Sequence, residues 1–353
     1  MKNKTVFSII IPTYNAKKYL KNCLASILKN DYPHYEIIVI DNASTDGSIG
    51  FIKKEFANLS EKIKIVSLNK NYGPSMARNE GVRIAKGKYL AFLDSDTEVH
   101  PDWMKAGLSF FEENKKVGAI QCKLLMLKNK KKIDYVGEHL SNLGFLVPLA
   151  KYGEKDEGQY NSSYKILAAK SAGMFIRKKV FEQVRGFDSD YFIFMEETDL
   201  GWRCWLSDYQ VALCPTSIVY HHFSASKEIF DKETNNRLVR FHGTKNYILT
   251  LFKNLSFINL IKILPINICL WLGLSGYLLF KGNFLSSFNI LKGICWNLTH
   301  FPQSLSKRWK IQRERKLTDE NLFKDFRLME KRPLFFFIKR FTISQKEMIT
   351  PEG

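Results

Sequence analysis

The first 115 residues alternate short apolar runs with longer stretches in which apolar positions recur at helical spacing. The apolar runs cover residues 7–11, 36–40, 64–68 and 89–93. Between the first two runs, one helix face carries Leu20, Cys23, Leu24, Ile27 and Leu28, and lysines lie off that face. This alternation predicts an α/β domain with a mostly parallel central sheet.

The pattern continues with two more helices and then becomes less regular. Pro74 and Pro101 stand where a first helical turn accepts proline, ahead of helical patterns at 75–86 and 102–114. Between about 118 and 222, the sequence indicates strands at 119–125, 172–176 and 211–220 and a helix at 199–206. We expect this second part to complete the same domain.

The composition changes after about residue 245. Residues 263–280 carry no charge, and a basic stretch follows at 307–316. We therefore divide the chain into an α/β domain at 1–245 and a helical, basic region at 246–353.

The uncharged segment is a candidate for membrane attachment. As a helix it would extend about 27 Å, close to the roughly 30 Å hydrocarbon core of a bilayer. It contains Pro265, Asn267 and Ser275, which make a single span marginal. A helix lying in the interface, with Trp271 and Tyr277 near the headgroups and the following basic residues on anionic lipid, is the favoured interpretation. A span and a buried soluble helix are the alternatives.

Charge and cysteines narrow the choice of partners and compartment. Lys and Arg outnumber Asp and Glu by 54 to 35, and the net charge of +19 attracts phosphates, nucleic acid or acidic lipid. The basic excess is spread along the chain without a recognition motif, so we expect no nucleic-acid partner. The six cysteines form no C-x-x-C pair and are expected to be reduced and buried. Because the N-terminal apolar run is also too short for a signal peptide, a cytosolic location is favoured.

Polar residues follow the first two predicted strands. The first strand stops at Pro12 and leads into Thr13, Tyr14 and Asn15. Since ligands bind at the carboxyl edge of parallel strands, Asp41 at the end of the second strand is expected to accept hydrogen bonds from a ribose or a base. An ordinary strand end explains the first segment equally well on its own. Turn or cap roles suit the nearby Ser44 and Asp46.

Two carboxylates, Asp94 and Asp96, follow the strand at 89–93, with Ser95 between them. Side by side at the mouth of a hydrophobic sheet they repel each other, and Mg²⁺ or Mn²⁺ would relieve this repulsion while sharing substrate phosphates. A solvated turn is the simpler alternative. The motif also resembles the nucleophile motif of haloacid-dehalogenase phosphatases. However, three strands already precede it, and the downstream lysine and paired aspartates of that family are not found.

Acids and histidines gather further along the chain. Glu196, Glu197 and Asp199 stand at the start of a predicted helix, after an aromatic and apolar run. The helix dipole accounts for one or two of these acids, whereas a partly desolvated carboxylate would be a general base near neutral pH. His221 and His222 end a strand, and because neighbouring side chains point to opposite faces, only one of them can easily reach a metal site.

Taken in order, these motifs resemble those of an inverting family 2 glycosyltransferase with the GT-A fold, between about residues 7 and 226. The matching segments are Ile11-Pro12-Thr13-Tyr14-Asn15, the loop 41–48, Asn71-Tyr72-Gly73, Ala77-Arg78-Asn79, Asp94-Ser95-Asp96, Arg185-Gly186-Phe187-Asp188 and Glu196-Glu197-Thr198-Asp199-Leu200. The resemblance implies that the nucleotide-sugar is bound by Pro12, Thr13, Tyr14, Asn15, Asp41, Gly73, Arg78, Asp94 and Ser95. It implies that Mg²⁺ or Mn²⁺ is held by Asp96, His221 and Asp94, with His222 as the second choice of histidine.

By the same resemblance, the catalytic base is Glu197, with Glu196 as the alternative. The family usually has Asp at this second position, and the longer Glu shifts the carboxylate by one methylene. The base would deprotonate an acceptor hydroxyl that attacks the anomeric carbon from the face opposite the leaving diphosphate. On the acceptor side, the resemblance points to Gly173, Asp199 and Arg203.

The tail after residue 245 resembles that of rhamnosyltransferase-like members of the family. With attachment at the cytoplasmic face of the cell membrane, this implies a lipid-linked acceptor such as a polyprenyl-diphosphate saccharide, and a role in making a cell-surface glycan. Two competing functions stay open. One is a phosphoryl- or nucleotidyl-transfer enzyme that uses Asp94 and Asp96, and the other is a basic membrane-binding protein without activity.

Overall fold

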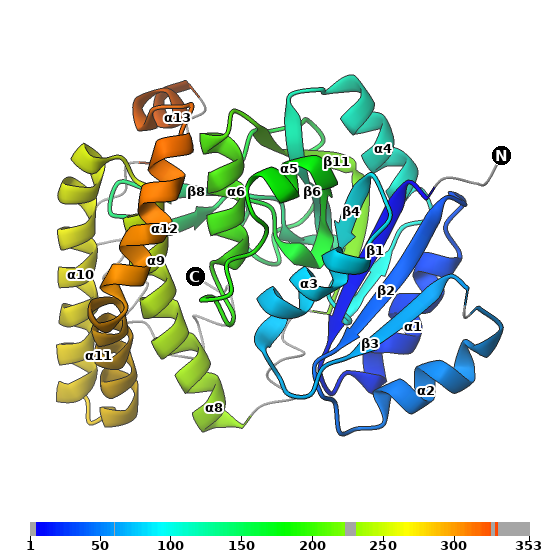
Figure 1. Cartoon of the computed structure of the whole chain (residues 1–353), viewed down its shortest axis with the longest axis horizontal. Coiled ribbons are helices and arrows are strands. Elements are labelled where there is room, and N and C mark those ends of the chain that lie inside the picture. The colour runs from blue at the N-terminus through cyan, green and yellow to red at the C-terminus, as the bar shows by residue number, and fades with distance from the viewer. Residues whose placement is uncertain (1–4, 60, 223–230, 326–328, 331–353) are drawn as a thin grey trace.

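The computed structural model describes residues 5–59, 61–222, 231–325 and 329–330, and a nine-stranded sheet forms its centre (Figure 1). In spatial order, the main path of the sheet is β3 (Ile63–Ser67), β2 (Tyr35–Asp41), β1 (Phe7–Thr13), β4 (Tyr89–Phe92), β10 (Met174–Arg177), β6 (Val117–Met126), β11 (Gln210–His221) and β5 (Thr97–Val99). The ninth strand, β7 (Asn129–Tyr135), pairs with β6.

The sheet is parallel in its first half and mixed beyond it. Strands β3, β2, β1 and β4 run parallel, β10 runs antiparallel to both of its neighbours, and β6 and β11 are again parallel. In the register of β1 and β2, Thr13 lies beside Asp41, so the polar ends of these two strands meet at one edge. The α/β class predicted from the sequence is confirmed.

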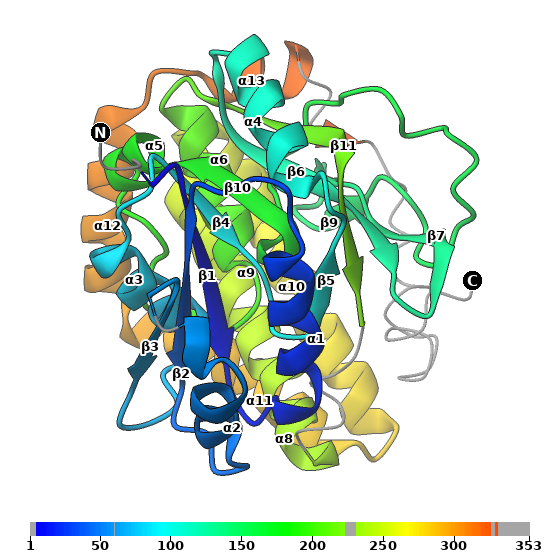
Figure 2. The ribbon, with the colours of Figure 1, turned by 90° about the vertical axis from the view of Figure 1, so that its right-hand side faces the viewer.

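Helices cover both faces of the sheet. Helices α1 (Lys17–Leu28), α2 (Ser48–Glu55) and α4 (Trp103–Glu113) pack on the face to which β1 contributes Ile9 and Ile11. The other face receives Ile10 and is covered by α3 (Gly73–Ile84), α5 (Lys178–Gln183) and α6 (Glu196–Leu206). Because successive side chains of a strand point to opposite faces, one apolar run fills two cores. Figure 2 shows α1 and α2 in front of the sheet and the C-terminal helices behind it.

The C-terminal region is helical, as predicted. Its helices are α8 (Lys232–Arg237), the π-helical turn Leu238–His242, α9 (Gly243–Asn254), α10 (Phe257–Phe280), α11 (Phe284–Thr299), α12 (Phe301–Glu314) and α13 (Asp319–Asp325). Helix α9 packs on α6, and the antiparallel pair α10 and α11 lies outside α9 (Figure 1). A three-stranded sheet joins β8 (Glu138–Ser141), β9 (Leu146–Pro148) and β12 (Met329–Glu330). Two 3-10 helices cover Ala57–Leu59 and Ser171–Gly173.

The two parts of the chain share one core. Leu249 and Leu251 of α9 belong to the same apolar cluster as Ile10 of β1 and Trp202 of α6. The boundary expected between residues 245 and 246 therefore falls inside a helix that packs on the α/β domain.

The structure changes three details of the C-terminal expectation. Helix α10 begins at Phe257 rather than 263, because the Ser256 side chain caps it by accepting a hydrogen bond from the Asn259 backbone N–H. It is the only helix among the described residues that is long and apolar enough to cross a membrane. Trp271 is buried against Phe145 instead of facing headgroups. The side chains of two cysteines expected to be buried are exposed, because they lie on the outer faces of α10 and α11; these are Cys269 and Cys295.

Candidate active site

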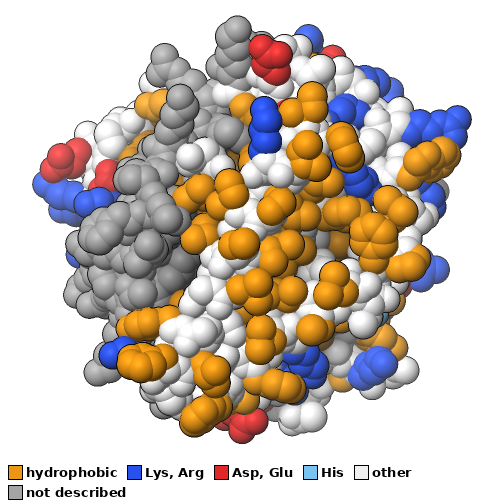
Figure 3. All heavy atoms as spheres, turned by 90° about the vertical axis from the view of Figure 1, so that its left-hand side faces the viewer, with side chains coloured by type: hydrophobic (Ala, Val, Ile, Leu, Met, Phe, Trp, Pro, Cys, Tyr) orange, Lys and Arg blue, Asp and Glu red, His pale blue; other side chains and the backbone are white. Residues whose placement is uncertain are grey.

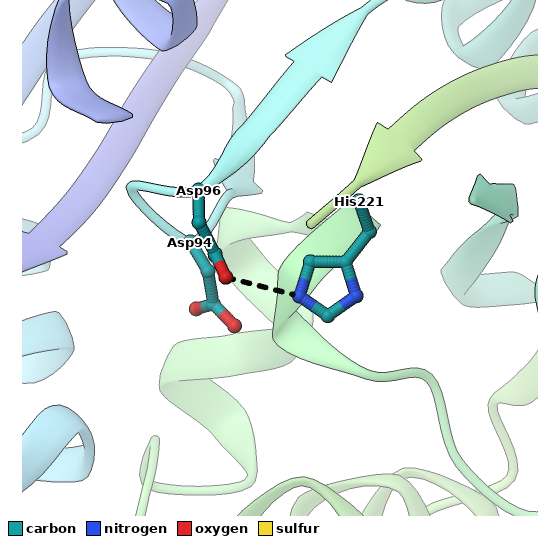
Figure 4. Close-up of side chains that lie close together, drawn as sticks. All are labelled: Asp94, Asp96 and His221. Carbon is teal, nitrogen blue, oxygen red and sulfur yellow. Dashed lines mark ion pairs between the residues drawn. The ribbon is translucent and has the colours of Figure 1, made fainter. Parts of the chain in front are cut away.

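The loop after β4 and the end of β11 bring three ligand-type side chains together. Asp94 and Asp96 lie in the loop between β4 and β5, and His221 is the last residue of β11, where it pairs with Thr97 of β5. One ligand atom from each of the three lies within 4.8 Å of the others, and His221 Nε2 is 3.6 Å from Asp96 Oδ2 (Figure 4). The structure thus brings together the three predicted metal ligands.

A hydrogen bond on the side away from Asp96 fixes the orientation of the His221 ring. Its Nδ1 is hydrogen-bonded to Asp134 Oδ2 of β7, which leaves Nε2 toward Asp96. Burial lowers the pKa of His221, but Asp96 and Asp134 outweigh this effect and hold it well above the usual value. His222 points the other way and packs on the Tyr19 ring with a centroid distance of 5.0 Å. The alternation of side chains along β11 therefore selects His221.

This donor set fits a hard divalent cation. Two carboxylates and an imidazole are ligands that Mn²⁺ or Mg²⁺ accepts in proteins. An imidazole whose second nitrogen is bonded to a carboxylate, as His221 is to Asp134, is the usual arrangement of a metal-binding histidine.

Arg78 of α3 connects this cluster to the acidic start of α6. Its buried guanidinium donates to Asp94 Oδ1 at 2.8 Å and to Glu196 Oε1 at 3.0 Å. Desolvation raises the pKa of Asp94, Arg78 opposes the rise, and repulsion from Asp96 adds to it. Asp94 therefore serves two neighbours: the arginine and the potential cation site.

Glu196 and Glu197 occupy the first turn of α6 in different surroundings. Ser171 donates its backbone N–H and its hydroxyl to Glu197 Oε1, at 3.1 and 2.6 Å. Burial raises the pKa of Glu197, but the charges of Lys170 and Arg78 and the bonds from Ser171 outweigh it, so that this pKa is lowered. For Glu196, burial and the charge of Glu197 raise the pKa to about 7 despite Arg78. Glu197 is therefore the acid that is ionised throughout the neutral range.

The nucleotide edge predicted from the sequence is built by the loops after β1 and β2. Asn15, at φ 48°, accepts the Thr45 N–H on Oδ1 at 2.8 Å, and Asp41 Oδ1 accepts the Ser44 N–H at 3.1 Å. The first of these bonds joins the two loops, and the second fixes the turn after β2. Among the described residues, the hydroxyls of Thr13 and Ser75 are buried without a hydrogen-bond partner, so both are free to bind a ligand at this edge.

Gly73 allows the segment before α6 to approach this edge. Its φ is +81°, and a Cβ at this position would lie 2.3 Å from the carbonyl oxygen of Phe192. Asn42 holds the start of α3 by donating to the Gly73 carbonyl and accepting the Tyr72 N–H, both at 3.1 Å. Only glycine fits here, because any side chain would push residues 188–195 away.

The three residues expected on the acceptor side lie in the supporting structure. The backbone of Gly173 packs so closely on β6 that a Cβ would lie 2.6 Å from Leu124 Cδ2. Asp199 is fully buried and forms ion pairs with Arg203 and with Lys253 of α9, each at 2.8 Å. Asp199 and Arg203 thus tie α6 to its surroundings, and no contact of theirs with an acceptor is proposed.

Several residues that build the site carry no recognisable sequence signal. They are Asp134, which holds His221, and Lys170 and Ser171, which surround Glu197. Asp134 lies in the lysine-rich strand β7, 87 positions from its histidine, so only the pairing of β7, β6 and β11 reveals the contact.

The profile of glycosyl transferase family 2 matches residues 8–185, which is half of the chain. The chain belongs to this family. The glycosyltransferase TuaG of Bacillus subtilis is 37% identical over 110 residues, covering 31% of this chain and 43% of TuaG. The poly(ribitol-phosphate) β-N-acetylglucosaminyltransferase TarS of Staphylococcus aureus is 34% identical over 110 residues, covering 31% of this chain and 19% of TarS. The matches therefore span less than half the length of these relatives.

Solved structures share the fold of this family 2 chain. TarS 1–349 in complex with UDP-GlcNAc superimposes with a TM-score of 0.51 at 18% identity, covering 74% of this chain and 71% of that one. The mannosyltransferase PcManGT from Pyrobaculum calidifontis, in complex with GDP-Man and Mn²⁺, gives a TM-score of 0.52 at 14% identity and covers 90% and 87%. The predicted GT-A fold and family 2 membership are confirmed. The phosphatase-like and non-enzymatic interpretations of the sequence are not supported.

Proposed function

We propose that this protein transfers a sugar from a nucleotide-diphosphate donor to a hydroxyl group, with inversion at the anomeric carbon. The observation that carries the proposal is the continuous chain of charged side chains in one site. It runs from His221 and Asp96 through Asp94 and Arg78 to the acid pair of α6. One arginine thus holds the cation-binding residues and the acid pair, which contains the catalytic base, at a fixed separation.

The donor binds at the cation end. Asp96, His221 and Asp94 hold Mg²⁺ or Mn²⁺, which would neutralise charge on the leaving diphosphate. Thr13 and Asp41, at the adjoining strand ends, receive the nucleoside. Mn²⁺ in two neighbours of the same fold, GalNAc-T7 with UDP and GalNAc and PcManGT with GDP-Man, supports this arrangement.

Glu197 is the base. Its Oε1 is occupied by Ser171, so Oε2 takes the proton of the acceptor hydroxyl. The acceptor oxygen forms the new bond to the anomeric carbon while the bond from that carbon to the diphosphate oxygen breaks, and the electron pair leaves with the nucleoside diphosphate. Lys170 and Arg78 keep Glu197 ionised before the acceptor binds.

The acceptor belongs to a cell-surface glycan precursor, and we place the reaction at the cytoplasmic face of the membrane. The name of TarS, a poly(ribitol-phosphate) transferase, supports an envelope polymer as the product class. The apolar helix α10 supports a lipid-linked acceptor such as a polyprenyl-diphosphate saccharide. In this proposal, the α/β domain, supported by α9, supplies the chemistry and helices α10 to α12 supply attachment.

A donor-hydrolysis and transfer assay tests the reaction. The wild-type protein, given nucleotide-sugars with UDP, dTDP or GDP as the leaving group, is expected to release nucleoside diphosphate only with Mn²⁺ or Mg²⁺. The Asp96→Asn and Glu197→Gln variants should lose this release. Liberation of inorganic phosphate or pyrophosphate instead of nucleoside diphosphate would show a phosphoryl- or nucleotidyl-transfer enzyme and overturn the proposal.

A further inference from the structure

The outer side of the C-terminal helices is a broad apolar surface. Of the twenty large hydrophobic residues that are most exposed in the described part of the chain, sixteen lie on α10, α11 and α12. Those with the greatest exposed fractions are Phe257, Ile258, Phe280, Phe284, Phe288 and Leu298, at 61–86%. Figure 3 shows apolar side chains gathered across this side of the molecule, with basic side chains mainly around its margin. We call it the outer helical face.

Most charges around the outer helical face are basic, and the exposed Glu314 at the end of α12 pairs with Arg185. From residue 234 to residue 313 the sequence contains no Asp or Glu. Between residues 257 and 313, the exposed basic residues are Lys262, Lys281, Lys292, Lys310 and Arg313. Arg313 lies over the Trp309 ring at 5.1 Å, a pairing of cation and aromatic that suits a lipid headgroup region. An apolar surface with basic margins complements an anionic lipid surface, whereas two copies packed face to face would bring like charges together.

The inner side of α10 packs against the rest of the protein. Asn267 donates to the Leu143 carbonyl at 3.0 Å, Trp271 packs on Phe145, and the Ser275 hydroxyl pairs with that of Ser287 at 2.8 Å. If α10 crossed a bilayer in this structure, the β8–β9 hairpin and α9 packed against it would enter the hydrocarbon with it. The polar groups of α10 also need these protein partners, because lipid offers none.

We propose that the outer helical face docks on an anionic lipid membrane, with α10, α11 and α12 lying in the plane of the interface. Their apolar side chains insert among the acyl chains and the basic margin contacts the headgroups. None of these three helices crosses the bilayer. This inference deepens the membrane placement that is part of the proposed function, and its tests use neither donor nor acceptor. Their failure therefore leaves the proposed sugar transfer untouched.

Vesicle binding tests the surface. The wild-type protein is expected to co-sediment with phosphatidylglycerol vesicles and less with phosphatidylcholine vesicles. Replacing two strongly exposed rings, in Phe280→Glu/Phe288→Glu, should lower the partition coefficient about 100-fold, since burial of each ring contributes roughly ten-fold. Ile84→Glu, an exposed apolar residue of α3 outside the face, is the matched control and should bind like the wild type.

Two results would overturn the proposal that the outer helical face docks on lipid. One is a wild-type protein that stays in the supernatant with phosphatidylglycerol vesicles. The other is a double variant that binds them as the wild type does. If that variant also abolished a dimer detected by sedimentation velocity, the face would be a contact between two copies of the chain and not a lipid-binding surface. Both replaced side chains are exposed, so an unchanged thermal melt should show that the variant is folded.

Depth measurement separates in-plane docking from a span. Cys269 lies near the middle of α10 and Cys295 lies on α11, and the other four cysteines are buried, so a thiol-reactive fluorophore labels this face selectively. In Cys295→Ser and Cys269→Ser proteins, each carrying one label, spin-labelled lipids with shallow nitroxides should quench both sites better than deep ones. Stronger quenching of Cys269 by deep nitroxides would place it at the bilayer centre and contradict in-plane docking.

Discussion

Removing the side chain of Asn246 should disable the acid pair, although its amide donates to the backbone before the pair and not to either acid. Its amide on α9 donates to the carbonyls of Ile193 and Phe194, at 2.8 and 2.7 Å. Phe194 and Met195, directly before Glu196, are both in the left-handed region, with φ values of 68° and 67°. Such conformations cost about 1–3 kcal/mol each in non-glycine residues, so other contacts must hold them.

The magnitude follows from the two hydrogen bonds. In Asn246→Ala each lost bond removes about 1 kcal/mol, and together they offset a large part of the strain. A loss of about 2 kcal/mol corresponds to about 30-fold in the population of the strained segment. We therefore expect kcat to fall by roughly 10- to 30-fold. Mn²⁺ affinity should be unchanged, because Asp96 and His221 lie on other elements.

A matched control separates this effect from loss of packing between helices. Asn297 also donates two bonds to backbone carbonyls, but these are those of Lys245 at 3.1 Å and Gly293 at 2.9 Å and not those of residues 193–195. Asn297→Ala should lower the melting temperature without lowering kcat to the same extent. Asn246→Asp, which keeps the shape but loses the donors, should behave like Asn246→Ala. Equal loss of kcat in Asn297→Ala, or full activity in Asn246→Ala, would refute the reasoning.

Three further predictions concern the charged groups. Asp134→Asn should weaken Mn²⁺ binding about 10- to 100-fold in a Mn²⁺ titration, because it releases the ring of His221; unchanged affinity would contradict this. Glu197→Gln should lower kcat by about 100-fold or more while nucleoside-diphosphate binding persists, and an inactive Glu196→Gln beside an active Glu197→Gln would show that the base is Glu196. Burial opposes ionisation of Asp188, but Lys253 and Lys307 hold its pKa well below the usual value, so the folded state binds fewer protons than the unfolded state. This contribution to stability is complete above the unfolded pKa of about 4 and is lost as the pH falls through the folded value, so thermal melts of the wild type should drop more steeply below pH 4 than those of Asp188→Asn.

The sequence predicts the parts of the site that lie at strand ends. Thr13, Asp41 and Asp94 each follow a buried apolar run, and parallel strands must bring such ends to one edge. His221 could be chosen as one of two histidines but not distinguished from His222, because the choice depends on which side of β11 faces Asp96. The tertiary arrangement of β11 beside β5 settles this contact.

Other features could not be read from the sequence, because their partners lie far along the chain. Asp199 and Arg203 form an i, i+4 pair, which by its spacing alone could lie on an exposed helix face. In the structure the pair is buried, and Lys253 of α9 forms a second ion pair with Asp199. From the sequence, Trp271 is expected at a membrane interface, but in the structure Phe145 of the β8–β9 region packs against it. The hydrophobic pattern thus predicts the helices, the strands and their apolar faces. Which apolar face is covered by protein and which stays exposed depends on neighbours from another part of the fold.

Metal-dependent binding of a nucleoside diphosphate tests the central claim most directly. Thermal melts of the wild type with UDP, dTDP or GDP should rise only when Mn²⁺ or Mg²⁺ is present, and a nucleotide at about 100 times its Kd stabilises by about 2.7 kcal/mol. One base should give the largest rise, Asp96→Asn should abolish it, and Glu197→Gln should retain it. A nucleotide shift that is independent of the cation, or one that survives in Asp96→Asn, would contradict the assignment of Asp94, Asp96 and His221 as the donor cation site.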